Sequence, residues 1–122
     1  MTHRKRILIV DDETELSDMV QLRLLADGYD VFIAKDGFEA MDKAEAYHPD
    51  LILLDLMMPD MNGHQVCQAL RSNPETSDIS IIMLTAKNQR YDKIKAKERG
   101  VRDYIVKPFE MDDLERRIEN CL

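Results

Sequence analysis

The sequence is poor in the residues that bind metal ions through sulfur or cross-link small domains. It contains only two cysteines, Cys67 and Cys121, whose spacing matches neither a disulfide framework nor a zinc motif. Both fall in helix-like segments, and we interpret them as small apolar residues. The three histidines are scattered without a partner pattern. We therefore expect neither a zinc site nor a cysteine–histidine nucleophile.

Long apolar runs are missing as well. The longest, residues 51–54 with 56–58, is interrupted by Asp55, whereas a helix that spans a bilayer needs about 20 apolar residues. The basic residues near the N-terminus are followed by only four apolar residues, too few for the hydrophobic part of a signal peptide. We therefore expect a soluble, cytoplasmic protein without a membrane contact.

Positive charge and chain-breaking residues are also scarce. The chain has 24 acidic and 17 basic residues, a net charge of -7, so direct binding to nucleic acid is not expected. Glycine and proline number four each, and no flexible linker is visible in the 122 residues. With 44% hydrophobic residues, residues 1–122 are expected to form one domain around one core.

Short apolar runs do alternate with longer amphipathic stretches. The runs predict strands at residues 7–10, 31–34, 51–54, 79–84 and 104–106. The stretches predict helices at residues 14–26, 38–47, 63–70, 88–99 and from about 111. Side chains expected to face the core include Leu16, Met19, Val20, Leu24, Leu114 and Ile118. This alternation is typical of an α/β fold with a parallel sheet covered on both faces.

Chemically active side chains follow four of the five predicted strands. They are Asp11 and Asp12 after the first strand, Asp55 after the third, Thr85 after the fourth and Lys107 after the fifth. In an open parallel α/β sheet, ligands bind outside the carboxyl ends of the strands. We therefore expect three carboxylates, a hydroxyl and an ammonium group at one edge of the sheet.

Crowded carboxylates need a compensating charge. Two of them about 4 Å apart repel by roughly 4 kcal/mol at an effective dielectric constant of 20, which protons or a divalent cation can offset. Oxygen ligands favour a hard ion such as Mg²⁺, and a lysine and a hydroxyl suit phosphoryl oxygens. The set predicts a phosphoryl-transfer site, with Asp55 as the carboxylate that forms an aspartyl phosphate.

Taken singly, each of these residues has a plainer interpretation. Asp11 and Asp12 could satisfy the N–H groups of a helix N-terminus, and Asp55 could be an ordinary loop acid. Thr85 could cap a helix, and Lys107 could be a solvated surface lysine. Only their joint placement after successive strands favours a site.

Four motifs, in this order and spacing, resemble the receiver domain of two-component response regulators. They are Asp11-Asp12 after ILIV, LILLDLMMPDMNG around Asp55, LTA at residues 84–86 and DYIVKPF at residues 103–109. The resemblance implies a flavodoxin-like, doubly wound sheet of five parallel strands in the order 2-1-3-4-5, with five helices. It also implies a phosphorylation-activated switch that catalyses only its own phosphotransfer and dephosphorylation, rather than an enzyme with an external substrate.

The resemblance further implies a phosphoacceptor and a metal site. Asp55 would accept the phosphoryl group from a sensor histidine kinase or a phosphotransfer protein. Asp12, Asp55 and the backbone carbonyl of Met57 would bind Mg²⁺, or Mn²⁺ in its place. Asp11 would act through a metal-bound water.

Other positions would stabilise the phosphoryl group and transmit its arrival. Lys107 would pair with Asp55 and then with the phosphoryl oxygens, and Thr85 would move to hydrogen-bond them. Tyr104 resembles the switch residue that turns inward as Thr85 moves. The bond between Lys107 and Pro108 would be a cis peptide. The positions that tune the phosphoryl lifetime are Met57 and Lys87, neither of which supplies an acid.

Basic residues gather around the fourth predicted helix: Lys93, Lys95, Lys97, Arg99 and Arg102. A solvated face is the plainer interpretation, and a partner surface is the alternative. The resemblance implies an output or homodimer face formed by the fourth helix, the fifth strand and the fifth helix. Across its two-fold axis Lys93 would pair with Asp113, and Asp103 with Arg117. Arg102 departs from transcription-factor receivers, in which an acidic residue is common.

Three other functions use similar parts. Phosphatases of the haloacid dehalogenase type carry a second acid two residues after the nucleophile, where this chain has Met57. P-loop nucleotide-binding proteins need a glycine-rich loop after the first strand, which is absent here. A non-phosphorylated interaction module on the same fold predicts an incomplete acidic set, whereas the set here is complete.

Overall fold

The structure, a computed structural model, describes residues 4–122, so the first three residues of the predicted domain lie outside it. Strands and helices alternate along the described chain. They are β1 (Arg6–Val10), α1 (Thr14–Ala26), β2 (Asp30–Ala34), α2 (Gly37–Tyr47), β3 (Leu51–Leu54), α3 (Gly63–Ser72), β4 (Ser80–Thr85), α4 (Arg90–Glu98), β5 (Asp103–Val106) and α5 (Met111–Cys121). All neighbouring strands are parallel, in the order β2-β1-β3-β4-β5. The predicted fold class and strand order are confirmed.

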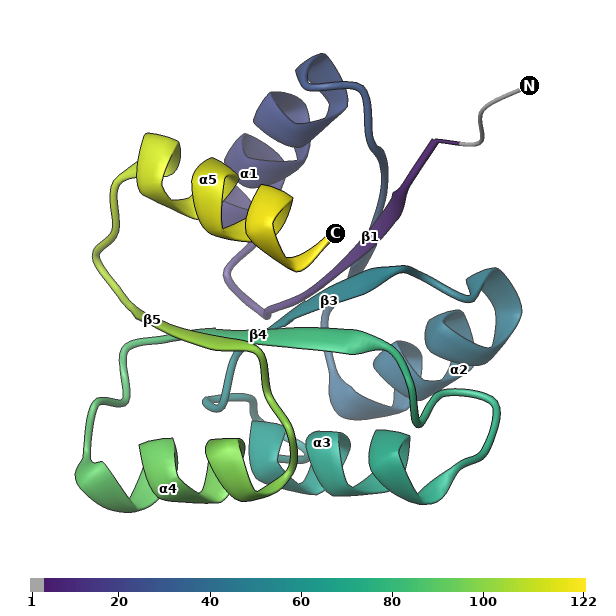
Figure 1. Cartoon of the computed structure of the whole chain (residues 1–122), viewed down its shortest axis with the longest axis vertical. Helices are drawn as coiled ribbons and strands as arrows, with labels where there is room; N and C mark the ends of the chain where they lie inside the picture. The colour runs from purple at the N-terminus through teal and green to yellow at the C-terminus, as the bar shows by residue number, and fades with distance from the viewer. Residues whose placement is uncertain (1–3) are drawn as a thin grey trace.

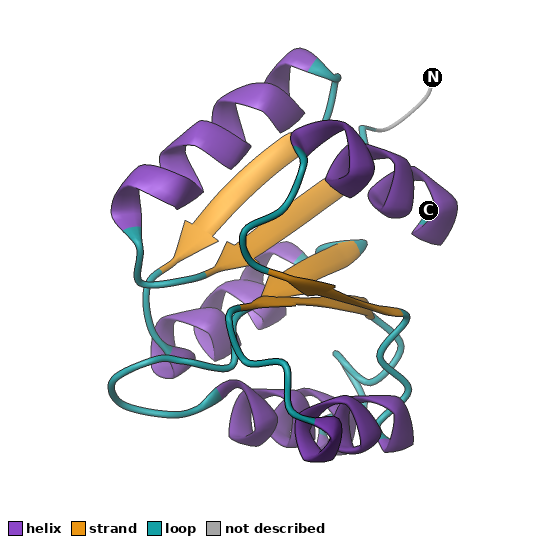
Figure 2. Ribbon diagram, turned by 90° about the vertical axis from the view of Figure 1, so that its left-hand side faces the viewer, coloured by secondary structure: helices purple, strands orange, loops and turns teal. Residues whose placement is uncertain are grey.

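The helices form a layer on each face of the sheet. Figure 1 shows α1 and α5 on one side of the strands and α2, α3 and α4 on the other. The view turned by 90° shows the strands enclosed between these two helical layers (Figure 2). A parallel sheet in this position is shielded from water on both faces, which explains the continuous apolar runs of its central strands.

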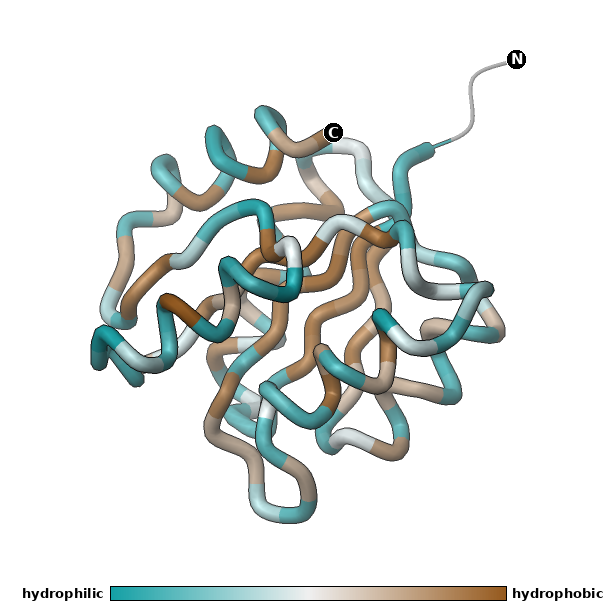
Figure 3. Tube along the Cα trace, turned by 60° about the horizontal axis from the view of Figure 1, so that its bottom comes forward, coloured by the Kyte–Doolittle hydropathy of each residue, from teal (hydrophilic) through white to brown (hydrophobic). Residues whose placement is uncertain are grey.

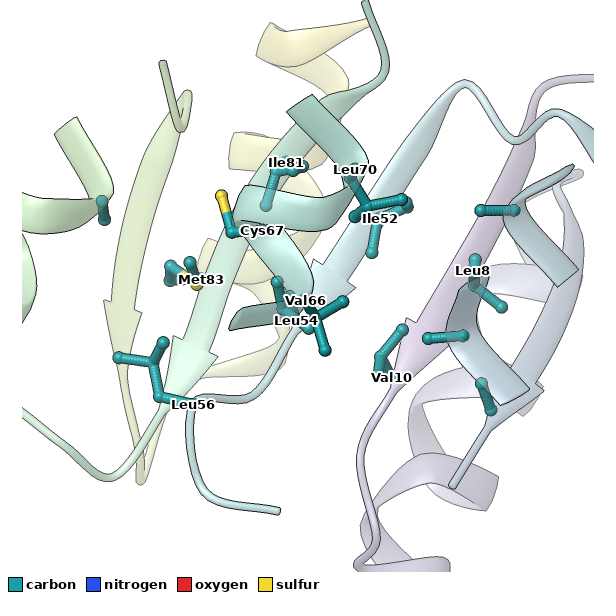
Figure 4. Packing of buried hydrophobic residues seen from close by; sticks show 14 residues of the cluster. Leu8, Val10, Ile52, Leu54, Leu56, Val66, Cys67, Leu70, Ile81 and Met83 are labelled. Carbon is teal, nitrogen blue, oxygen red and sulfur yellow. The ribbon is translucent and has the colours of Figure 1, made fainter. Parts of the chain in front are cut away.

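The sheet divides the core into two apolar clusters. On β1, Leu8 and Val10 belong to the cluster under α2 and α3, whereas Ile7 and Ile9 belong to the cluster under α1 and α5. This alternation follows from the period of two in a strand. Figure 4 shows the first cluster, in which side chains of β1, β3 and β4 meet those of α3. Figure 3 shows the hydrophobic strands at the centre of the chain, surrounded by more hydrophilic helices and loops.

The core predictions hold for most of the named side chains. Val20, Leu24, Leu114 and Ile118 are buried. Met19, however, was expected in the core and is 51% exposed. The buried stripe of α1 runs through Ser17, Val20 and Leu24, and a residue one position before Val20 is turned about 100° away from that stripe.

Several element boundaries differ from the predictions by one or two residues, and the fourth strand and the fourth helix are two examples. The fourth strand is Ser80–Thr85 and therefore includes Thr85, because Thr85 continues the pairing with β5 opposite Val106. The fourth helix is Arg90–Glu98, two residues shorter at its start than predicted, with Gln89 as its N-cap. Within residues 4–122, no helix has the length and apolarity needed to cross a membrane.

Candidate functional site

The register of the two central strands places two acids side by side. Val10 pairs with Leu54, so Asp11 and Asp55 leave the sheet at the same level. The backbone N–H of Asp55 donates to the carbonyl of Val10 at 3.0 Å. Each aspartate is only 3% exposed. Because a buried carboxylate is costly unless it is paired, this edge of the sheet requires a compensating positive charge.

A third carboxylate completes the acidic cluster. Asp11, Asp12 and Asp55 each offer an oxygen, and these oxygens lie within 4.8 Å of one another. Asp12 is exposed, whereas the other two are buried. Burial raises the pKa of Asp11, and the charge of Asp55 adds to this effect, while hydrogen bonds from Lys107 and Glu13 oppose it. A donor set of oxygens alone fits a hard divalent cation such as Mg²⁺.

Lys107 supplies the positive charge to this cluster. Its Nζ lies 2.7 Å from Asp11 Oδ2, 3.2 Å from Asp55 Oδ2 and 3.0 Å from Glu13 Oε1. The lysine side chain is only 10% exposed, so it is no ordinary surface lysine. Burial by itself lowers the pKa of Lys107, but its hydrogen bonds to Asp11 and Glu13 and the nearby charges raise it above its usual value. The group is therefore a fixed ammonium beside the buried acids.

Glu13 was absent from the predicted site residues. Its side chain is 60% exposed and approaches Lys107 from the start of α1, where Glu13 is the N-cap residue. Its backbone N–H donates to Asp11 Oδ1 at 2.9 Å. Its position in the sequence could have indicated a role in the site, because Glu13 directly follows Asp11 and Asp12 in the short connection between β1 and α1.

Thr85 and Tyr104 meet at the backbone of Lys87. Thr85 ends β4, is fully buried, and its Oγ1 accepts a hydrogen bond from the N–H of Lys87 at 3.2 Å. The hydroxyl of Tyr104 donates to the carbonyl of Lys87 at 2.7 Å. Burial, with the charges of Asp92 and Asp55, raises the pKa of Tyr104 to about 12, so this hydroxyl keeps its proton at neutral pH. Both predicted switch residues thus contact the same short segment before α4.

The loop after Asp55 carries the remaining predicted positions. Asp55 Oδ1 accepts a hydrogen bond from the N–H of Met57 at 3.0 Å, and the Met57 side chain is 50% exposed. Lys87 is also exposed. Across the sheet edge, the N–H of Lys107 donates to the carbonyl of Thr85 at 2.9 Å, and the bond between Lys107 and Pro108 is cis.

Charged residues of α4, β5 and α5 pair within the chain. Arg117 lies 2.9 Å from Asp103 Oδ1 and 3.0 Å from Asp113 Oδ2, and Arg116 also contacts Asp113. Lys93 Nζ lies 5.9 Å from the centre of the Tyr104 ring. Arg117, Asp103 and Asp113, which were expected to pair across a two-fold axis, therefore form ion pairs within one chain. Lys93, the fourth such residue, lies near the ring of Tyr104.

A second buried polar pair, outside the predicted site, joins α3 to α4. His64 Nε2 lies 2.9 Å from Asp92 Oδ1, and the side chain of Asp92 is only 6% exposed. Neither residue was singled out from the sequence. The sequence gives little indication of this pair, because the histidine and the aspartate are separated by 28 positions. They come together only when the two helices lie side by side.

Comparison with known proteins places these observations in a family. The sequence profile described as the response regulator receiver domain matches residues 7–119. The chain is 44% identical over 117 residues to the DNA-binding dual master transcriptional regulator RpaA of Synechocystis, covering 96% of this chain and 48% of that protein. It is 43% identical to the alkaline phosphatase synthesis transcriptional regulatory protein PhoP of Bacillus subtilis, covering 97% and 48%. The chain thus spans about half the length of these two relatives.

Solved structures agree with the sequence comparison. The chemotaxis protein CheY4 of Vibrio cholerae superposes with a TM-score of 0.92 at 32% identity, covering 98% of this chain and all of that one. A CheY-like receiver domain protein from Methanospirillum hungatei superposes with a TM-score of 0.91 at 31% identity, covering 97% and 93%. The profile match and the full-length structural similarity lead to one conclusion: the chain belongs to the response regulator receiver domain family, the phosphorylation-activated switches of two-component signalling.

Proposed function

We propose that Asp55 is the phosphoacceptor of this receiver domain. One observation carries the proposal: a carboxylate that is 3% exposed lies within 3.2 Å of a buried ammonium and beside two further acids. An Asp55 oxygen attacks the phosphorus of a phosphohistidine, so that an oxygen–phosphorus bond forms as the phosphorus–nitrogen bond breaks. The phosphoryl group moves to Asp55, and the donor histidine leaves and takes up a proton.

The acidic cluster is suited to hold the ion that this transfer needs. Asp11, Asp12, Asp55 and the backbone carbonyl of Met57 would hold Mg²⁺, or Mn²⁺ in its place. When bound, the ion supplies positive charge for the phosphoryl oxygens. The composition of the cluster supports this role, because three carboxylates surround the ammonium of Lys107 and carry more negative charge than it neutralises.

Lys107, Thr85 and Tyr104 would detect the new phosphoryl group. The Nζ of Lys107 already contacts Asp55 and needs only a small movement to reach a phosphoryl oxygen. Thr85 Oγ1 accepts a hydrogen bond from the N–H of Lys87, and its O–H can donate to a phosphoryl oxygen on Asp55, which draws the side chain toward the site. Because Tyr104 is bonded to the same residue, the movement of Thr85 alters the segment before α4.

The acceptor is tested by mass spectrometry. Incubation with acetyl phosphate and Mg²⁺ is expected to add one phosphoryl group to the wild type and none to Asp55→Asn. Asp42→Asn, on the exposed face of α2, is the matched control and is expected to be phosphorylated normally. An adduct of full yield on Asp55→Asn refutes the assignment.

The partner that delivers the phosphoryl group is expected to bind along α1. Met19, Leu22 and Leu25 are 51%, 70% and 42% exposed on this helix, which is unusual for a row of large apolar side chains. Met19 also lines a cavity together with Phe109 and Lys107, next to the site. We therefore assign this surface to a sensor histidine kinase or a phosphotransfer protein.

The output is assigned to the face of α4, β5 and α5, through a homodimer of phosphorylated chains. Ile94 is 47% exposed on α4, and Asp103 of β5 forms an ion pair with Arg117 of α5. Sedimentation of the phosphorylated protein is expected to show dimers for the wild type and monomers for Ile94→Glu. Leu22→Glu, on α1, is the control that leaves dimerisation intact. Dimers formed equally by Ile94→Glu rule out this face.

The wider role follows from the same proposal. Residues 1–122 act as one receiver domain that catalyses only its own phosphotransfer and dephosphorylation. A cytoplasmic location fits, because phosphoryl donors derived from ATP are made there. Regulation of transcription, named for RpaA and PhoP, is proposed for the whole protein, with the contacts to DNA made outside this acidic domain.

A further inference from the structure

The first residue of α2 touches the loop that follows Asp55. A Cβ atom added to Gly37 would lie 2.8 Å from Met61 Cβ, 3.0 Å from Met61 Sδ and 3.1 Å from Val66 Cγ2. Met61 Cβ is attached to the backbone and cannot turn away. Any residue larger than glycine at position 37 would therefore push the loop away from α2.

Neither backbone conformation nor helix formation requires this glycine. The described glycines with positive φ are Gly28 and Gly100, so Gly37 has a conformation open to other residues. The helix start is already capped by Asp36, whose side chain accepts from the N–H of Glu39 at 2.8 Å. Glycine disfavours a helix relative to alanine. The close approach to Met61 is thus the physical reason for a glycine at this position.

The contact secures the loop between β3 and α3 at a second point. At its start, Asp55 Oδ1 accepts from the N–H of Met57. Farther along, Asp60 Oδ1 accepts from the N–H of Gly37 at 3.4 Å, and Met61 packs against the buried cluster under α2 and α3. The segment with Met57 is therefore held between Asp55 and the start of α2.

We propose that Gly37 is a positioning residue for the metal-binding part of the site. Its bare backbone lets the start of α2 hold the loop in the position from which Met57 presents its carbonyl. The inference rests on the proposed function, because it assigns Met57 to the Mg²⁺ site. Gly37 itself touches none of the proposed metal ligands, so its influence on the metal passes through Asp60 and Met61.

The test is calorimetric titration of the folded protein with MgCl₂, well below its melting temperature. Gly37→Ala is expected to raise the Kd for Mg²⁺ roughly tenfold, as is typical when support behind a ligand is lost. Phe38→Ala, one residue later on α2 and 66% exposed, is the matched control with unchanged Kd. In the presence of chelator, Gly37→Ala is expected to melt below the wild type, whereas helix propensity alone predicts the opposite sign.

A compensating variant separates the steric contact from other effects. Met61→Gly removes the Cβ that an alanine at position 37 would meet, so Gly37→Ala/Met61→Gly is expected to bind Mg²⁺ more tightly than Gly37→Ala. If Gly37→Ala does not fold, the double variant must regain folding, and its failure to do so overturns the inference.

The outcomes also separate this inference from the proposed function. If the wild type binds Mg²⁺ and Gly37→Ala binds it equally well, the positioning role of Gly37 is refuted and the phosphoacceptor assignment stands. A Gly37→Ala variant that melts above the wild type in chelator refutes it as well. A wild type that binds no Mg²⁺ overturns the proposed metal site, and this inference with it.

Discussion

Replacing Lys107 by methionine tests the electrostatic account of the site most directly. The substitution keeps an unbranched side chain of similar length and removes the Lys107 ammonium that contacts Asp11 and Asp55. Both acids are 3% exposed, so the variant leaves two buried carboxylates without their partner. Removing one member of a buried ion pair costs about 3–5 kcal/mol. Glu13, at 60% exposed, adds little because water solvates it.

This loss is large enough to measure by thermal unfolding. For a chain of this size it corresponds to a fall of about 10–20 °C in Tm, followed by circular dichroism in the presence of chelator. Lys97→Met, on the exposed face of α4, is the matched control and is expected to change Tm by no more than about 2 °C. Adding Asp11→Asn to Lys107→Met removes one of the unpaired charges, so the double variant is expected to regain part of the lost stability.

The effect of Mg²⁺ on the stability of Lys107→Met is expected to have the opposite sign. The ion and the Lys107 ammonium are attracted by the same carboxylates, so loss of the ammonium is expected to tighten Mg²⁺ binding. A ligand at about a hundredfold excess over its Kd stabilises the folded state by about 2.7 kcal/mol, and Lys107→Met is expected to gain more than the wild type. A variant that melts with the wild type in chelator, and responds to Mg²⁺ no more strongly, refutes the reasoning.

Three further results are expected. Asp12→Ala should remove most of the Mg²⁺-dependent rise in Tm and stabilise the metal-free protein by no more than about 1 kcal/mol, because Asp12 is exposed; an unchanged Mg²⁺ response in thermal melts contradicts this. The aspartyl phosphate should last minutes or longer, since neither Met57 nor Lys87 offers an acid or base to activate water; decay within seconds after donor removal is the contrary result. Asp92→Asn should weaken the 2.9 Å contact with His64 and lower the free energy of unfolding by about 1–3 kcal/mol. A double-mutant cycle with His64→Gln that finds no coupling between the two residues contradicts this.

The sequence alone determined the elements and the class of chemistry. Apolar runs such as residues 51–54 are long enough for strands and too short for core helices, and the helical stretches between them require parallel crossovers. Because parallel strands end at one edge of a sheet, the placement of Asp11, Asp55 and Lys107 after strands was sufficient to predict that they meet. The family motifs then supplied the strand order, which the structure confirmed.

How these groups pair depends on the folded arrangement of the chain. Lys107 lies 96 positions from Asp11, and no local pattern states that it makes its shortest contact there, shares Glu13, and lies farther from Asp55. The exposure of Met19 was equally undetermined, because a helix with apolar residues on two faces has more than one stripe to bury. The close contact between the backbone of Gly37 and Met61 depends on how α2 packs against a loop that is distant in the sequence. Periodicity and strand ends follow from local geometry, whereas these contacts follow from the packing of helices over a twisted sheet, which brings together residues that the chain itself keeps far apart.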